Sequence, residues 1–186
     1  MVIKNDRILD AAAEVLAKRP DATLQTIAIA AGISRTTIFN RYPTRELLIE
    51  ALAIDALQRI GQVMQCIPTE YAANFDAVIM DITRGLMPLG PRTTFLRIIP
   101  GKSNDLDKHW EDVATPLAIY IAQIQAQGLL RVDQPARWLV ASYIGLLFAA
   151  WDEIVAGELG QVQAARLVVD TWLSGVTHRS SSVVAT

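Results

Sequence analysis

The sequence predicts an all-α fold of about nine helices, divided into a small N-terminal domain over residues 1–48 and a larger C-terminal domain over residues 49–186. Apolar residues recur at helical spacing, and the sequence lacks the apolar–polar alternation of a half-buried strand. Of the 186 residues, 52% are hydrophobic and 19% are charged, which suits a buried core and argues against disorder.

The N-terminal domain carries three short helical patterns, which we expect over residues 5–18, 24–31 and 35–42. Ile8, Ala12 and Leu16 form the apolar side of the first, and Pro20 ends it. Between the second and the third, Gly32 can take the positive φ that a tight turn requires. Ser34 then offers its hydroxyl as the N-cap of the third helix. These features predict a helix-turn-helix.

The third helix has an outer face without acidic side chains. Its residues there are Arg35, Thr36, Thr37, Asn40 and Arg41. The chain has a net charge of −2, yet residues 34–45 hold three cations and no acid. Cations, hydroxyls and an amide on a short helix suit the major groove of double-stranded DNA. The positive charge is local, and it supplies enough phosphate contacts if a dimer doubles it.

The C-terminal domain should contain six further helices. Their expected ranges are 45–65, 69 or 70 to 87, 92–99, 104–127, 134–156 and 161–176. Thr44 caps the first of them, which links the two domains. Pro116 should kink its helix or restart it with Thr115 as cap. We expect the tail from residue 178 to be frayed.

Residues 137–155 are apolar almost all the way round, whereas a surface helix keeps a polar face. This helix is therefore either the centre of a monomer or buried on two sides. We favour a homodimer in which the last two helices of each chain form a four-helix interface across a two-fold axis. The expected interface residues are small or apolar: Ser142, Gly145, Ala149, Leu167, Val168 and Trp172.

Several N-terminal segments have characteristic residues at fixed spacing. They are ILDAA at 8–12, IA at 27–28, AGIS at 31–34, TIF at 37–39, YP at 42–43 and RELL at 45–48. This set resembles the TetR family of transcriptional repressors over about the first 55 residues. The rest of the chain is similar to the family only in length and helical pattern.

The resemblance implies which side chains contact DNA. By this resemblance, the hydroxyls of Thr23 and Thr37 and the cations Arg41 and Arg45 contact the phosphates. The same resemblance places Gln25, Arg35 and Thr36 at positions that contact base edges. Asn40 lies on the same helical face.

Three residues depart from the family pattern. Phe39 stands where the family usually has Tyr, so it either contacts DNA without a hydroxyl or only packs. Tyr42 stands where Phe is usual, which moves a hydroxyl to the end of the third helix and keeps it in the expected DNA-binding set. Arg45 replaces a frequent Lys, which retains the charge and adds a bidentate fork.

The resemblance also implies a ligand pocket in the C-terminal domain. The candidates are Met80, Met87, Phe95, Trp110, Tyr120, Tyr143, Phe148 and Trp151. Trp110 is favoured because it lies in a charged stretch beside Pro116. Such side chains more often form core. A mostly apolar lining indicates a small hydrophobic or aromatic molecule as the ligand.

We therefore expect a DNA-binding transcriptional regulator, namely a dimeric repressor that a ligand releases from a palindromic operator. The alternatives are a regulator without a small-molecule effector, and a helical enzyme or small-molecule carrier that kept a DNA-binding core. Catalysis is not expected. The sequence has only two His and no motif with the spacing of a metal site or a phosphate-binding loop, so we expect no catalytic residue, metal or cofactor.

The sequence also indicates a cytoplasmic protein. Its one cysteine, Cys66, excludes an intramolecular disulfide and suits a reducing compartment. No signal peptide is expected. The longest apolar run, 138–151, is shorter than the roughly 20 residues of a membrane span, so no membrane partner is expected.

Overall fold

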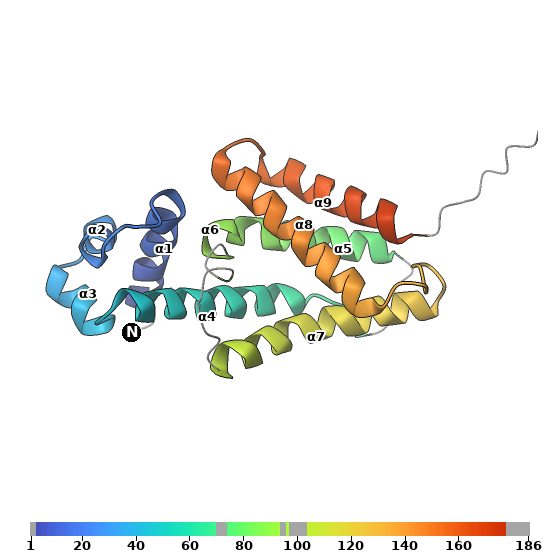
Figure 1. Ribbon diagram of the computed structural model, residues 1–186, viewed down its shortest axis with the longest axis horizontal. Coiled ribbons are helices and arrows are strands. Elements are labelled where there is room, and N and C mark those ends of the chain that lie inside the picture. Colours follow the sequence, from blue (N-terminus) through green and yellow to red (C-terminus); the bar gives the residue numbers. More distant parts are fainter. Residues whose placement is uncertain (1–2, 70–73, 94–95, 97–103, 178–186) are drawn as a thin grey trace, which may run out of the picture.

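The structure is a computed structural model that describes residues 3–69, 74–93, 96 and 104–177. Over these residues the chain is α-helical, with short 3-10 turns and one isolated bridge between Leu130 and Thr177, so the expected all-α class is confirmed. The N-terminal unit consists of α1 (Ile3–Lys18), α2 (Leu24–Ala30) and α3 (Arg35–Arg41). It lies at one end of the molecule in Figure 1.

The long helix α4 (Arg45–Met64) runs from the N-terminal unit into the larger C-terminal body (Figure 1). That body contains α5 (Phe75–Leu86), the 3-10 turn η1 (Met87–Leu89), α6 (Gly90–Thr93), α7 (Asn104–Ala126), α8 (Ala136–Ala156) and α9 (Gln161–Val176). Helix α7 packs against α4 and α8, and α9 packs against α5 and α8.

The turn between α2 and α3 forms as the sequence predicts. Gly32 has φ +65°, in the left-handed region that favours glycine. The Ile33 amide then donates to the Ala28 carbonyl at 3.0 Å, which closes α2. At the start of α3, the Ser34 side chain accepts a hydrogen bond from the Thr37 amide at 3.1 Å. Both helix ends at the turn are therefore satisfied by local bonds.

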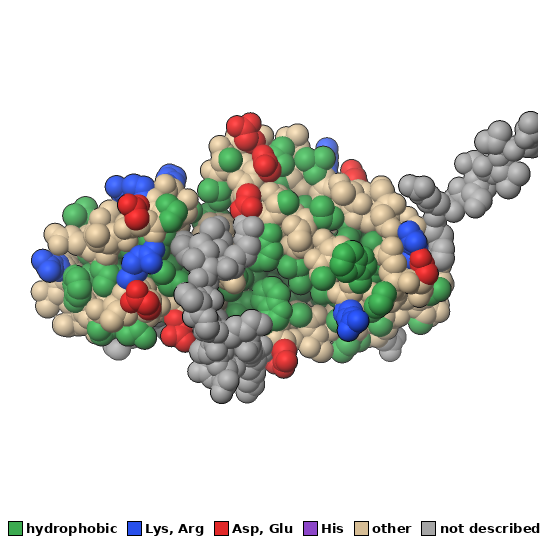
Figure 2. All heavy atoms as spheres, viewed as in Figure 1, with side chains coloured by type: hydrophobic (Ala, Val, Ile, Leu, Met, Phe, Trp, Pro, Cys, Tyr) green, Lys and Arg blue, Asp and Glu red, His purple; other side chains and the backbone are tan. Residues whose placement is uncertain are grey.

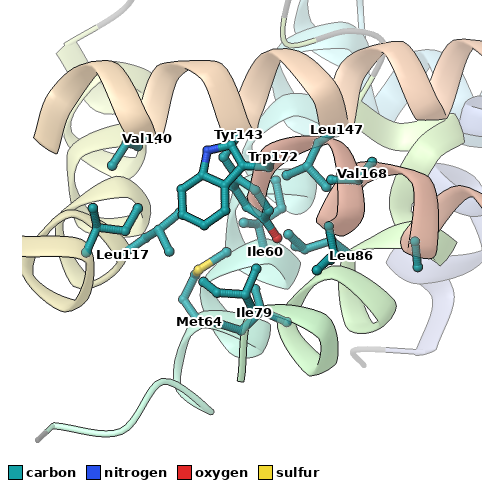
Figure 3. Packing of buried hydrophobic residues seen from close by; sticks show 14 of the residues in the cluster. Ile60, Met64, Ile79, Leu86, Leu117, Val140, Tyr143, Leu147, Val168 and Trp172 are labelled. Atoms are coloured by element: carbon teal, nitrogen blue, oxygen red, sulfur yellow. The ribbon is translucent and has the colours of Figure 1, made fainter. Parts of the chain in front are cut away.

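Two separate hydrophobic cores divide along α4. The N-terminal core includes Leu48 and Leu52 together with residues of α1 to α3. The C-terminal core begins at Ala53 and extends through α5, α7, α8 and α9. Figure 3 shows the Trp172 ring of α9 among aliphatic side chains of this second core. Helix α4 thus contributes to both cores and connects the two units.

Three expectations about helix bounds are corrected. Helix α5 begins at Phe75 rather than at 69 or 70, because turns follow α4 through residue 69. Helix α6 begins at Gly90, since Pro91 fits a first helical turn where its missing N–H is not needed. The expected 92–99 helix and the tail extend into residues outside those described. Helix α7 does not restart at Thr115, and it passes through Pro116 with α4 and α8 packed against it.

The apolar helix α8 is longer than the uninterrupted run that the sequence shows. Its 21 residues and mean hydropathy of 1.6 meet the length and composition of a membrane span, so the argument from the short run was wrong. Core helices of soluble proteins meet the same criterion, and it carries little weight for a single helix. Only 33% of its most apolar stretch is buried in one chain, which leaves much apolar surface to be covered.

Candidate DNA interface and ligand pocket

The outer face of α3 is exposed at the free end of the N-terminal unit. Side chains exposed there are Arg35, Thr36, Thr37, Asn40 and Arg41, and Gln25 of α2 is exposed as well. Helices α2 and α3 pack against each other, so these residues belong to one surface. Figure 2 shows Lys and Arg side chains gathered over this end of the molecule. This face has the shape and charge for a major groove.

The hydroxyls of Thr23 and Thr37 are both engaged in local bonds. Thr23 is the N-cap of α2, and its hydroxyl accepts from the Thr26 amide at 3.2 Å. The Thr37 hydroxyl lies 2.7 Å from that of Ser34. Both residues remain exposed, so they stay candidates for phosphate contact while they also hold the starts of the two helices.

Substituting Ser34 by alanine is expected to lower the free energy of unfolding by about 1 kcal/mol, because the Thr37 amide loses its capping partner. Chemical denaturation measures this loss. Thr36→Ala is the matched control, since Thr36 is exposed on the same helix and is not its cap. Equal destabilisation by the two substitutions would contradict the capping role.

Phe39 lies beneath the side chain of Arg35. The guanidinium carbon of Arg35 is 5.3 Å from the centre of the Phe39 ring, a cation–π arrangement. The ring therefore orients Arg35 on the outer face of α3, and this packing role needs no hydroxyl. Whether Phe39 also contacts DNA stays a prediction.

One expected DNA contact, Tyr42, is corrected, and a second, Arg45, has a contact within the chain but stays a candidate for phosphate contact. Tyr42 is only 6% exposed and belongs to the N-terminal core, where burial raises the pKa of its hydroxyl. The guanidinium of Arg45 donates to the carbonyl of Pro20, so it ties the start of α4 to the loop between α1 and α2. These partners lie 25 positions apart, and no local pattern in the sequence indicates such a contact.

The C-terminal body contains a small apolar pocket of about 40 Å³. Its walls are Ile60, Met64, Leu86, Leu96, Trp110, Val113, Ala114, Leu117, Tyr143, Ile144, Leu147, Phe148 and Trp151. The structure thus brings together four of the expected residues, namely Trp110, Tyr143, Phe148 and Trp151.

The other expected ligand residues lie elsewhere. Met87 and Tyr120 are buried in the core, and Met80 packs at its edge without reaching the pocket. Phe95 lies outside the described residues. Most of the wall is aliphatic, and sequence reasoning missed it because aliphatic wall and core residues share the same helical spacing.

Polar atoms of the wall residues are directed away from the pocket. The Thr83 hydroxyl donates to the Ile79 carbonyl at 2.6 Å, so the Tyr143 hydroxyl, 2.7 Å away, donates to Thr83. Burial raises the pKa of Tyr143, which therefore stays neutral. The indole N–H of Trp151 donates to the Leu86 carbonyl at 3.2 Å. The wall atoms that face the pocket are consequently apolar.

One face of α8 and α9 is left uncovered. Gly145 and Ala149 are exposed on α8, Ser142 is half-buried, and Leu167 is exposed on α9. A side chain added at Gly145 would meet only open space. Sequence reasoning missed Trp138, which is 59% exposed one turn before Ser142. The spacing of four residues from Ser142 is a signal that could have found it.

Two expected interface residues are corrected. Val168 and Trp172 are buried within the chain, because they lie on the side of α9 that faces its own core. The indole N–H of Trp172 donates to the Leu139 carbonyl at 3.0 Å and so joins α9 to α8. These residues stabilise the pairing of the two helices from within.

The model of the tetR family of bacterial regulatory proteins matches residues 8–52, which span the N-terminal core. The N-terminal domain of the chain is therefore a TetR-family DNA-binding domain. It is 23% identical to the HTH-type transcriptional regulator NfxB of Pseudomonas aeruginosa, over 98% of this chain and 99% of NfxB. It is 37% identical to the HTH-type transcriptional repressor LfrR of Mycolicibacterium smegmatis, over 50% of this chain and 49% of LfrR.

Solved structures of TetR-like regulators share the fold. The match to the structure of LfrR in complex with proflavine covers 95% of this chain and 98% of the LfrR chain, with a TM-score of 0.76 and 24% sequence identity. The match to the TetR family regulator PfmR of Thermus thermophilus covers 90% of this chain and 97% of the PfmR chain, with a TM-score of 0.72 and 16% sequence identity. These likenesses show the fold. The family-model match and the similarity to NfxB and LfrR make the chain a DNA-binding transcriptional regulator.

Proposed function

We propose that the protein is a homodimeric repressor, which leaves a palindromic operator when a small aromatic molecule occupies the apolar pocket. The DNA-binding domain comprises residues 1–48, and residues 49–186 bind the effector and the second chain. The observation that carries this proposal is an apolar pocket in the same chain as an exposed, acid-free α3 face. Such a regulator works in the cytoplasm, where its operator lies.

The uncovered face of α8 and α9 supports the dimer. One recognition helix reads few base pairs, and two copies related by a two-fold axis read two half-sites about 34–36 Å apart. Small residues at Gly145 and Ala149 let a partner helix approach closely, and Trp138 adds a large apolar side chain beside them. Covering this surface in a four-helix interface removes apolar area from water.

The pocket chemistry supports an aromatic ligand without a buried charge. Its walls combine tryptophan and phenylalanine rings with aliphatic side chains, and the Tyr143 hydroxyl and the Trp151 N–H already have partners. A charged group inside this pocket would lose its hydration without compensation. LfrR, a relative of similar fold, has been solved with proflavine, an aromatic molecule that is cationic at neutral pH. Proflavine is a practical first probe for the aromatic rings of the pocket, with its charge left at the side open to solvent.

Ala114→Phe is expected to fill the pocket and weaken proflavine binding at least tenfold, because Ala114 lines the wall and a phenyl ring there competes with the ligand. Fluorescence titration measures the dissociation constant for proflavine. The matched control is Ala122→Phe, an identical change at an exposed position of α7.

Each outcome of this titration separates the proposed pocket from other sites. Weaker binding in Ala114→Phe alone supports the pocket. Unchanged binding in both variants would place the probe elsewhere. No binding by the wild-type protein would remove cationic proflavine-like molecules from the ligand class and leave neutral aromatic molecules as the ligands to test.

A further inference from the structure

One guanidinium joins the two units of the molecule. The Nε atom of Arg92, on α6, lies 3.0 Å from Oδ2 of Asp55 on α4. Another nitrogen of the same group forms an ion pair with Asp10 on α1, in the N-terminal unit. Because the fork of an arginine is planar and rigid, two carboxylates held by it are fixed relative to each other. Arg92 thus connects the C-terminal body, here called the effector unit, to the N-terminal unit, here called the DNA-binding unit.

The arrangement is a chain of alternating charges, part of it shielded from water. Arg59 donates from Nε to the same Asp55 oxygen at 2.9 Å, so two cations alternate with two carboxylates. The side chains of Arg92 and Asp55 are 15% and 12% exposed, whereas that of Asp10 is 49% exposed. The Arg92–Asp55 pair is therefore the anchored end, and the Asp10 end is the one that can open at low cost.

The other side of α6 touches the wall of the pocket. Gly90 packs so closely on the Trp151 indole that a Cβ there would lie 2.9 Å from its Cδ1 atom. Trp151 lines the pocket and bonds the Leu86 carbonyl, just before η1. Pro91 fixes φ between Gly90 and Arg92, so this short segment is stiff. A shift of the Trp151 ring toward Gly90 would therefore press on the segment that carries Arg92.

We propose that Arg92 is a positioning residue that sets the orientation of the DNA-binding unit on the effector unit and transmits movement of the pocket wall to it. The inference rests on the proposed function for its biological meaning, because the wall moves when a ligand enters. With Trp151 undisturbed, Arg92 holds Asp10 and Asp55 together. Displacing α6 breaks the Asp10 pair first and releases α1, so the two α3 helices of a dimer lose their fixed spacing.

The first test measures orientation without DNA or ligand. Nitroxide labels at Lys18 and Ala122, both exposed, report the distance between the units by pulsed electron resonance in a Cys66→Ser background. Labelled chains are diluted with unlabelled ones, so that only distances within one chain are seen. Asp10→Asn and Arg92→Ala should broaden the distance distribution. The melting temperature should stay nearly unchanged in Asp10→Asn, because Asp10 is half exposed.

Two controls separate positioning from a general loss of stability. Glu14→Gln removes one exposed acid from the same helix as Asp10 and should leave the distribution as in the wild type. Arg92→Lys keeps the charge but is a single point donor, so it should restore the narrow distribution only in part. Distributions for Asp10→Asn and Arg92→Ala that superimpose on the wild type would overturn the proposal.

The second test examines transmission on operator DNA. Gly90→Ala places a methyl group against Trp151 and so displaces the pocket wall. In the wild-type background it should weaken operator binding about tenfold, a usual size for coupling between sites. In the Asp10→Asn background the same substitution should change affinity less than about twofold. Gly175→Ala, in open space on α9, is the matched control.

The two readouts distinguish the failure of each proposal. Equal effects of Gly90→Ala in both backgrounds would show that the pocket wall acts on DNA binding by another route, and would overturn transmission through Arg92. If no DNA is bound specifically, the proposed repressor function fails, and the distance measurement alone decides whether Arg92 positions the two units.

Discussion

The variant Ala149→Arg is expected to be monomeric and to lose about a thousandfold in affinity for a two-half-site operator, the usual margin between specific and non-specific binding. Ala149 lies on the uncovered face of α8 beside Gly145, where the proposed partner helix approaches. An arginine there places an unpaired charge and a long side chain in an apolar helix contact. Sedimentation velocity measures the mass, and fluorescence anisotropy measures the affinity.

Ala122→Arg makes the same chemical change on an exposed part of α7 and should leave both the mass and the affinity unchanged. The proposed interface would be wrong if Ala149→Arg remained a dimer with full affinity. A protein that is already monomeric and binds its operator tightly as a single chain would contradict the dimer itself.

Arg35→Ala is expected to weaken operator binding by about 2–6 kcal/mol, because each of the two α3 helices loses a base contact of about 1–3 kcal/mol. Arg35 is exposed on α3, and the Phe39 ring beneath it holds its guanidinium in place. The variant should also lose its preference at one base pair in each half-site. Affinities for operators altered one base pair at a time measure both effects.

The control for Arg35→Ala is Arg84→Ala, which removes the same charge from an exposed position of α5. It should leave operator affinity nearly unchanged. If Arg35→Ala weakened binding to operator and scrambled DNA by the same factor, Arg35 would be a phosphate contact, and base reading would fall to other residues of α2 and α3.

The helix-turn-helix could be predicted from sequence because its signals are local. Gly32 supplies the positive φ, and Ser34 and Thr44 cap the helices that follow them, each within three residues of the amide it bonds. Bonds of this kind depend on nearest neighbours along the chain. The order and extent of α8 and α9 followed equally well, because long apolar patterns end at clear turns.

Contacts between distant segments could not be predicted in this way. Nothing near Arg45 indicates that it reaches the Pro20 carbonyl, and nothing near Tyr42 indicates that it turns into the core. For α9 the two sides are both apolar, so sequence alone could not decide that Trp172 faces its own chain and Leu167 faces outward. The family resemblance gave roles to positions, and burial then changed the role of Tyr42.

The pocket wall shows the same limit. Aromatic residues such as Trp110 and Trp151 could be named as wall candidates because the chain has few of them. Val113 and Leu147 also line the pocket, but their sequence pattern is the same as that of core residues. A wall and a core differ only in whether a neighbouring side chain fills the space, which depends on how α4, α7 and α8 meet. The apolar chemistry of the ligand could be predicted from composition, and the identity of most wall residues could not.

The most direct measurement is a titration of the protein into labelled DNA from upstream of its own coding region, followed by anisotropy at several salt concentrations with scrambled DNA as control. Proflavine is then added to the wild-type protein and to Ala114→Phe, so that its own binding to DNA is separated from release through the pocket. The proposed function predicts two chains per site, a preference of about a thousandfold or more over scrambled DNA, a steep salt dependence, and release on adding the ligand. Equal, weak binding to every sequence in a random-sequence selection, with or without the ligand, would contradict it.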